Sequence, residues 1–136
     1  MPDDFWADAE VIHTHSRAQA IDDGTLVELP EADCREAGFR FPVCVTSSVW
    51  ESCIHWPADE EGLQDEAGRL WDVLWMARNA GLRARDTDRV QFQLHVVPRG
   101  GDASDNEMPP LVTLVMHIGP GDTPDPVITI MQPGED

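Results

Sequence analysis

Two pairs of side chains in this sequence have the types that bind zinc. His13 and His15 lie in the β-branched segment Val11–His15, which is predicted to form a short strand. Because residues i and i+2 of a strand share a face, both histidines can ligate one ion. Cys53 and His55 have the same spacing on a predicted helix, where their directions differ by about 200° and exclude joint chelation. The sequence has no CxxC pair and no HExxH motif, so we expect no metal requirement.

Other candidate motifs lack a residue that their chemistry requires. The run from Asp102 to Asn106 begins like a calcium loop, but Glu107 stands where such a loop needs glycine. Cys34 and Cys44 have no adjacent histidine that would lower the pKa of a thiol. The sequence contains no GxSxG nucleophile elbow and no phosphate-binding loop. We therefore expect no catalytic residue and no cofactor.

One enzymatic alternative involves the region around His13. The order strand, His13, Thr14, short helix, Asp23, Gly24, strand resembles the opening of ADP-ribosyltransferases, in which a strand histidine holds the nicotinamide dinucleotide. Those enzymes usually carry Gly-Thr after the histidine, whereas this sequence has Thr14-His15. They also need a later catalytic glutamate, and no acidic residue stands out for that role. The analogy concerns fold order alone, and it remains the alternative to a protein without enzymatic activity.

Acidic side chains dominate the 136 residues. The chain has 26 Asp and Glu against 9 Lys and Arg, a formal net charge of −17, and every basic residue is arginine. Direct nucleic-acid binding and docking on anionic membranes both need basic patches, so the composition argues against them. No apolar run approaches the roughly 20 residues of a membrane span, and the acidic start lacks the positive region of a signal peptide. Three cysteines without framework spacing predict a reduced, cytoplasmic protein.

The acids themselves have two interpretations. They can simply keep the protein soluble, or they can imitate a nucleic acid by presenting carboxylates at phosphate-like density to a positively charged channel. The second interpretation needs clustered acids that are unpaired in sequence, and two patches qualify, one beside a predicted long helix and one in a long loop. The candidate partner-binding residues are Asp59, Glu60, Glu61, Asp65 and Glu66 in the first patch, and Asp102, Asp105 and Glu107 in the second. Asp22 and Asp23 are assigned a local role in a turn.

The elements that position these acids are predicted from hydrophobic periodicity. An amphipathic helix over Gly62–Ala80, ended by Gly81, is the clearest. Alternating apolar residues in Val90–Val96, followed by Leu111–Ile118 and Val127–Met131, predict an antiparallel meander. The fold class is therefore α+β: a single domain over residues 1–136, with a mostly C-terminal antiparallel sheet packed by one long central helix. The predicted core residues are Trp71, Leu74, Trp75, Phe92, Leu94, Val112, Leu114 and Ile128.

Shorter elements precede the long helix. Thr14 or Ser16 can cap a short helix that Gly24 ends, and a strand over Thr25–Leu29 follows. Pro30 and Gly38 bound a second short helix. Residues 39–45 are predicted to be extended and, because of Pro42, confined to an edge or to an irregular strand. Caps from Thr46, Ser47 or Ser48 predict a helix that Pro57 closes.

Much of the sequence resembles a family of small, uncharacterised acidic proteins carried on plasmids, prophages and other mobile elements of bacteria. The segments that carry the resemblance are Val11–Leu29, Arg35–Phe39, Pro42-Val43, Val49-Trp50, Val96–Arg99, Gly119–Asp122 and Pro126–Met131. The resemblance implies the company of a mobile element, and it supplies no established activity. Small acidic accessory proteins of mobile elements are often anti-restriction or anti-CRISPR inhibitors. We therefore expect a stoichiometric inhibitor that binds a basic host protein or ribonucleoprotein complex.

Overall fold

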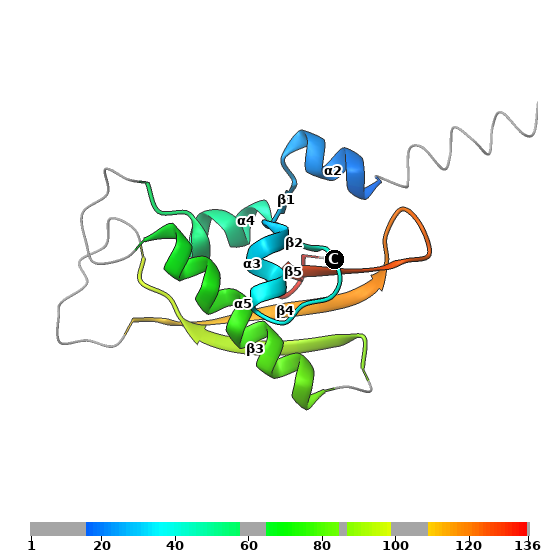
Figure 1. Cartoon of the computed structure of the whole chain (residues 1–136). Helices are drawn as coiled ribbons and strands as arrows, with labels where there is room; N and C mark the ends of the chain where they lie inside the picture. Colours follow the sequence, from blue (N-terminus) through cyan, green and yellow to red (C-terminus); the bar gives the residue numbers. More distant parts are fainter. Residues whose placement is uncertain (1–15, 58–64, 85–86, 99–108, 136) are drawn as a thin grey trace, which may run out of the picture.

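A five-stranded sheet, built mainly from the C-terminal third of the chain, lies at the centre of the fold. The computed structural model describes residues 16–57, 65–84, 87–98 and 109–135. The predicted α+β class and the antiparallel meander of the last three strands are both confirmed (Figure 1). The strands, in their order across the sheet, are β1 (Leu26–Glu28), β2 (Val43–Thr46), β5 (Pro126–Met131), β4 (Leu111–Pro120) and β3 (Arg89–His95).

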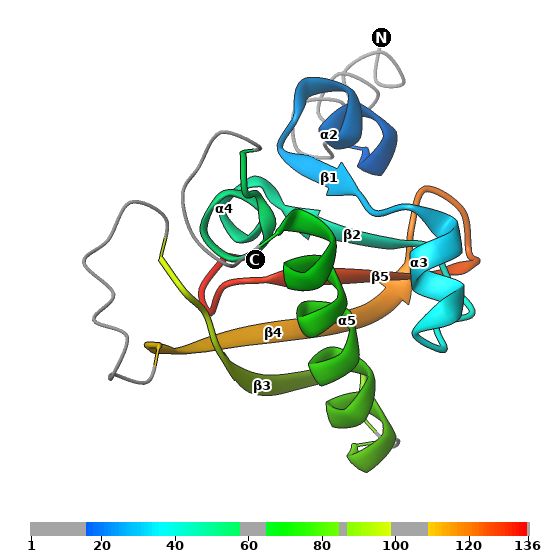
Figure 2. The same cartoon turned by 60° about the vertical axis from the view of Figure 1, so that its left-hand side comes forward.

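One long helix and four short helical segments accompany the sheet. Figure 2 shows the long helix α5 crossing one face of the sheet, with α3 on the same side and α2 beyond β1. The helices are α2 (Arg17–Asp23), α3 (Glu31–Glu36), α4 (Ser47–Val49), which continues as the π-helix η1 (Trp50–Ile54), and α5 (Glu66–Arg83). Within the described residues, no helix is both long and apolar enough to cross a lipid bilayer.

Residues 39–45 were predicted to be confined by Pro42 to an edge or to an irregular strand, and the edge position is wrong. Strand β2 begins at Val43, one residue after the proline, so the missing N–H of Pro42 removes no bond from the strand itself. The carbonyl of Pro42 accepts a hydrogen bond from Ile128 N at 2.9 Å. Strand β2 is consequently interior: it pairs with β1 antiparallel and with β5 parallel, in the register Val43 to Ile128.

The predicted long helix is present as α5, but its bounds and its buried face differ from the prediction: it begins at Glu66, after the extended N-cap Asp65, and not at Gly62. The helix continues through Gly81 to Arg83. Trp71 and Trp75, both predicted to be core residues, are exposed at 37% and 43%. The side chains that pack on the sheet are smaller and lie on the opposite side of the helix; they are Leu70, Val73, Leu74, Ala77 and Ala80. Of the other predicted core residues, Leu74, Phe92, Leu94, Leu114 and Ile128 are buried, and Val112 is partly buried against the core.

Two glycines that follow helices need the left-handed conformation, and replacing them is expected to have different costs. Gly24 has φ +86° and Gly38 has φ +102°. A Cβ added at Gly24 meets no atom within 4 Å, whereas one at Gly38 would lie 2.2 Å from Nε of Arg78. We expect Gly24→Ala to destabilise by about 1–2 kcal/mol, the backbone cost alone, and Gly38→Ala by about 2–4 kcal/mol. Urea unfolding measures both, and equal costs would show that Arg78 moves aside freely.

Candidate functional site

Most of the two acidic patches predicted from sequence lies outside the described residues. This holds for Asp59, Glu60 and Glu61 of the first patch and for Asp102, Asp105 and Glu107 of the second. The remaining two, Asp65 and Glu66, are described, and both are engaged within the molecule. Their role as partner-binding residues stays a prediction.

Asp65 and Glu66 stabilise the start of α5. Asp65 is the N-cap, and its carboxylate accepts a hydrogen bond from Gly68 N at 2.5 Å, which satisfies an amide that has no partner within the helix. Oε1 of Glu66 lies 2.7 Å from Nδ1 of His55 and accepts from Trp56 N at 3.4 Å. Asp65 thus caps α5, and Glu66 joins the segment that follows η1 to α5.

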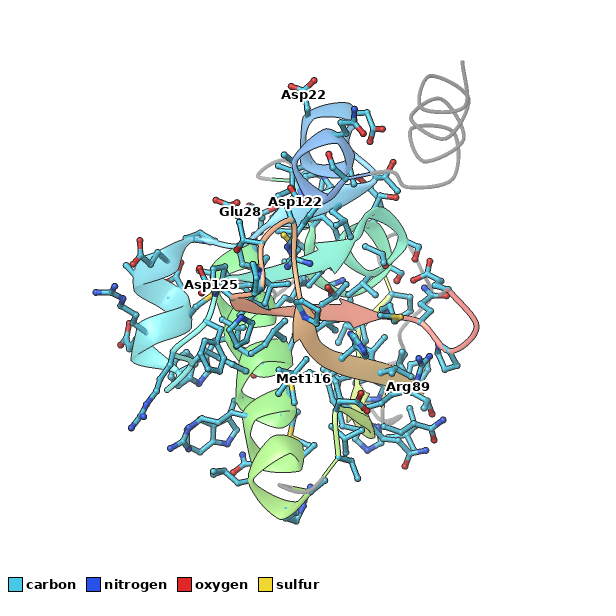
Figure 3. The ribbon with its side chains drawn as sticks, turned by 90° about the vertical axis from the view of Figure 1, so that its right-hand side faces the viewer. Asp22, Glu28, Arg89, Met116, Asp122 and Asp125 are labelled. Atoms are coloured by element: carbon cyan, nitrogen blue, oxygen red, sulfur yellow. The ribbon has the colours of Figure 1, made fainter. Side chains whose placement is uncertain are left out.

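A different set of carboxylates gathers where α2, β1 and the β4–β5 loop meet. Figure 3 shows the side chains of Asp22, Glu28, Asp122 and Asp125 on the same side of the molecule. All four are exposed, and exposed Asp23 lies beside Asp22 at the end of α2. We call Asp22, Asp23, Glu28, Asp122 and Asp125 the acidic edge. Sequence reasoning missed it because its members lie about a hundred residues apart. The predicted turn role is confirmed for Asp23, whose carboxylate accepts from Thr25 N at 2.9 Å and from Thr25 Oγ1 at 2.6 Å.

Hydrogen bonds from the backbone hold the acidic edge together. The carboxylate of Asp122 accepts from Arg17 N at 2.7 Å and from Ala18 N at 2.9 Å, so the β4–β5 loop is held at the start of α2. The amides of Ala18 and Arg17 keep the pKa of Asp122 below its ordinary value. Ser16 caps the same helix in a capping box with Gln19, which confirms its predicted role. The edge is thus anchored on a fixed backbone.

Arg17 partly offsets these carboxylates, whereas Arg69 and Arg78 are engaged elsewhere in the molecule. The guanidinium of Arg17 donates to Thr129 Oγ1 and to Ile128 O, each at 2.7 Å. Arg69 is buried, and Arg78 lies over the ring of Trp75. Arg17 lies in α2, the helix that also carries Asp22 and Asp23, and its charge acts on Asp122. The five carboxylates of the acidic edge outnumber this guanidinium, so the edge keeps a net negative charge.

The contact between Asp122 and α2 predicts a pH-dependent stability. Because folding lowers the pKa of Asp122, its contribution is complete above the ordinary carboxyl pKa of about 3.9 and disappears as pH falls through the lower folded value. We expect Asp122→Asn to lower Tm at pH 7 and to match the wild type at the acid end. Thermal unfolding followed by circular dichroism between pH 7 and 2 measures this. Asp125→Asn, in the same loop, is the control, and an Asp122→Asn deficit that persists at low pH would contradict the prediction.

The described residues show little nucleophilic or metal-binding chemistry. All three cysteines are free and buried, and burial raises the pKa of Cys34 to about 11 and also raises the pKa of Cys44 and of Cys53. Their thiolates are therefore scarce at neutral pH. No group of three or more His, Cys, Asp or Glu that could hold a metal occurs in the described residues. The predicted zinc candidates His13 and His15 lie outside that part of the chain.

Comparison with known proteins places the chain in a family. The sequence model of a family of unknown function (DUF6573) matches residues 2–136. The chain belongs to DUF6573. No curated protein and no solved structure matches it. Membership of DUF6573 assigns no activity and no functional residues, so the function of this DUF6573 member has to be inferred from its own surface.

Proposed function

We propose that the protein is a non-enzymatic, stoichiometric inhibitor whose acidic edge binds a basic nucleic-acid groove on a partner protein or ribonucleoprotein complex. One observation carries the proposal. Three separate elements bring five exposed carboxylates to one side of the molecule, and Asp122 fixes two of these elements to each other. Like charges repel when they are gathered in this way, and a basic partner relieves that repulsion.

The kind of partner follows from charge and from the sequence resemblance. Carboxylates on a fixed backbone can replace phosphates in a cationic groove, and complementary potentials favour this association. The resemblance to mobile-element proteins suggests a bacterial defence complex of the restriction or CRISPR type. The ADP-ribosyltransferase alternative gains no support from the described residues, because His13 lies outside them.

Charge reversal on the acidic edge tests the proposal. The variant Glu28→Arg/Asp125→Arg changes two exposed carboxylates, and Glu36→Arg/Asp88→Arg makes the same change in net charge elsewhere on the exposed surface. From a bacterial lysate at low salt, we expect the wild type and the control pair to retain a basic nucleic-acid-binding complex that the edge variant loses. The complex should dissociate at about 0.5 M salt, because screening shortens the reach of the charges. Added duplex DNA or RNA should also displace the protein.

Two outcomes would contradict this function. If the partner complex is retained equally at low and high salt, and equally by the wild type and the edge variant, the carboxylates serve only to keep the protein soluble. Loss caused instead by Asp59→Arg/Glu60→Arg/Glu61→Arg, with the edge variant unaffected, would move the binding surface to the first patch predicted from sequence. The variants are compared only after their Tm values are shown to match the wild type.

A further inference from the structure

The outer side of α5 carries a stripe of large apolar side chains. Trp71, Trp75 and Leu82 are exposed at 37%, 43% and 46%, and their spacing of i, i+4 and i+11 places them on one side of the helix. Phe41, exposed at 39%, is a further large apolar side chain at the surface. Solubility gives no reason to group such residues on a protein of charge −17, and grouped exposed apolar residues mark interaction surfaces.

The stripe is ordered by contacts among its own members. The rings of Trp71 and Trp75 stack with centroids 5.8 Å apart and planes at 20°. The guanidinium of Arg78 lies 5.6 Å from the centroid of Trp75, and its side chain packs where a Cβ on Gly38 would sit. Side chains already held in this way lose little rotamer freedom when a partner binds. We call Trp71, Trp75, Arg78 and Leu82 the tryptophan face.

Two arginines of α5 adjoin the tryptophan face. Arg78 belongs to it, and exposed Arg83 follows in the last turn of the helix. The acid that adjoins the stripe on α5 is Asp72, which also interacts electrostatically with Arg69. At physiological salt the Debye length is about 8 Å, so a segment bound along α5 senses these two arginines more than charges on elements farther away.

We propose that the tryptophan face binds an acidic amphipathic helix of a partner protein. The ridge from Trp71 to Leu82 is about 16 Å long, and a helical partner can set apolar side chains at i, i+4, i+7 and i+11 against it. The surrounding guanidinium groups favour carboxylates on the flanks of that helix. This inference goes beyond the proposed function, because the acidic edge and the tryptophan face select partners of opposite charge, and the protein can bridge two molecules.

A designed peptide tests the inference directly. The probe is an 18-residue helical peptide with leucines on one face and glutamates on both flanks, titrated into the full chain by calorimetry. We expect Trp71→Ser/Trp75→Ser to weaken Kd by at least about 30-fold, the effect of truncating one tryptophan hot spot. We expect Arg78→Gln/Arg83→Gln to weaken Kd about 10-fold and to reduce its dependence on salt. Both variants should lower Tm by no more than a few degrees and remain folded at the temperature of the titration, which thermal unfolding checks.

Matched controls separate this inference from the proposed function. Peptide binding should not weaken in Glu28→Arg/Asp125→Arg, the variant of the acidic edge. A peptide with lysine in place of glutamate should bind at least about 10-fold more weakly than the probe. The inference would be overturned if the two peptides bind with equal Kd, or if Trp71→Ser/Trp75→Ser binds the probe with the same Kd as the wild type. Concentration-dependent self-association lost in Trp71→Ser/Trp75→Ser would also overturn it, because the face would then join two copies of this chain. None of these results depends on the lysate experiment.

Discussion

Replacing Arg69 with methionine is expected to lower the free energy of unfolding by about 3–5 kcal/mol. Arg69 lies on α5 and is only 3% exposed. Its guanidinium donates to three backbone carbonyls: Ile54 O at 3.0 Å, Val97 O at 2.7 Å and Ser52 O at 3.2 Å. It also lies 4.9 Å from the centroid of the Trp56 ring. Methionine fills part of the volume but leaves these acceptors without their donors, and unsatisfied buried acceptors are costly.

The position of those carbonyls explains why one side chain has so large an effect. Two of them belong to η1, and the third follows β3, so Arg69 ties three segments together. Urea unfolding followed by circular dichroism measures the loss. The control is Arg35→Met, which breaks an exposed pair with Glu31 on α3 and should cost about 0.5 kcal/mol or less. Similar losses in the two variants would contradict the prediction, and Arg69→Lys provides an intermediate case if Arg69→Met does not fold.

Leu74→Ala is expected to destabilise the protein by about 3–5 kcal/mol, whereas Trp71→Ala should cost about 1 kcal/mol or less. Leu74 lies on the buried side of α5 and is fully inaccessible to solvent, so its truncation leaves a cavity in the core. Trp71 keeps more than a third of its surface in solvent, and its main ring contact is with Trp75. The same urea titration ranks the two variants. A larger loss of stability in Trp71→Ala than in Leu74→Ala would contradict this prediction and would indicate that Trp71 belongs to the core, as the sequence predicted.

Trp71 and Trp75, which were predicted to be core residues, show that hydrophobic periodicity cannot decide which side of an apolar helix faces the sheet. The central part of α5 is apolar on two sides, one with Leu70 and Leu74 and the other with Trp71 and Trp75. Both sides have helical spacing, so local pattern alone does not tell which one faces the sheet. The choice is made by packing: Val73 and Ala77 let the helix approach β3 closely, and bulky indoles on that side would hold it away.

Patterns of neighbouring residues predicted single helices and strands well, but they did not predict which distant strands pair. The alternation of Val90, Phe92 and Leu94 placed β3 correctly on the core, since a strand with one buried face has a period of two. Nothing local indicates that Val43 pairs with Ile128, because strand pairing across a long separation depends on the whole fold. The acidic edge escaped prediction for the same reason: only the fold brings Asp122 to the start of α2.

The parallel pairing of β2 with β5 also sets the order in which the protein can assemble during synthesis. About 80 residues separate Thr46 from Pro126, and a ribosome adds roughly 5–20 residues per second. The nascent chain therefore holds an incomplete sheet for roughly 4 to 16 s. During this interval β2 lacks β5 at one of its edges, whereas β4 is made just before β5 and lacks it only briefly. Unpaired strand edges attract other chains. Folding has to wait for the last strand, and chaperones have that interval in which to protect the exposed edges.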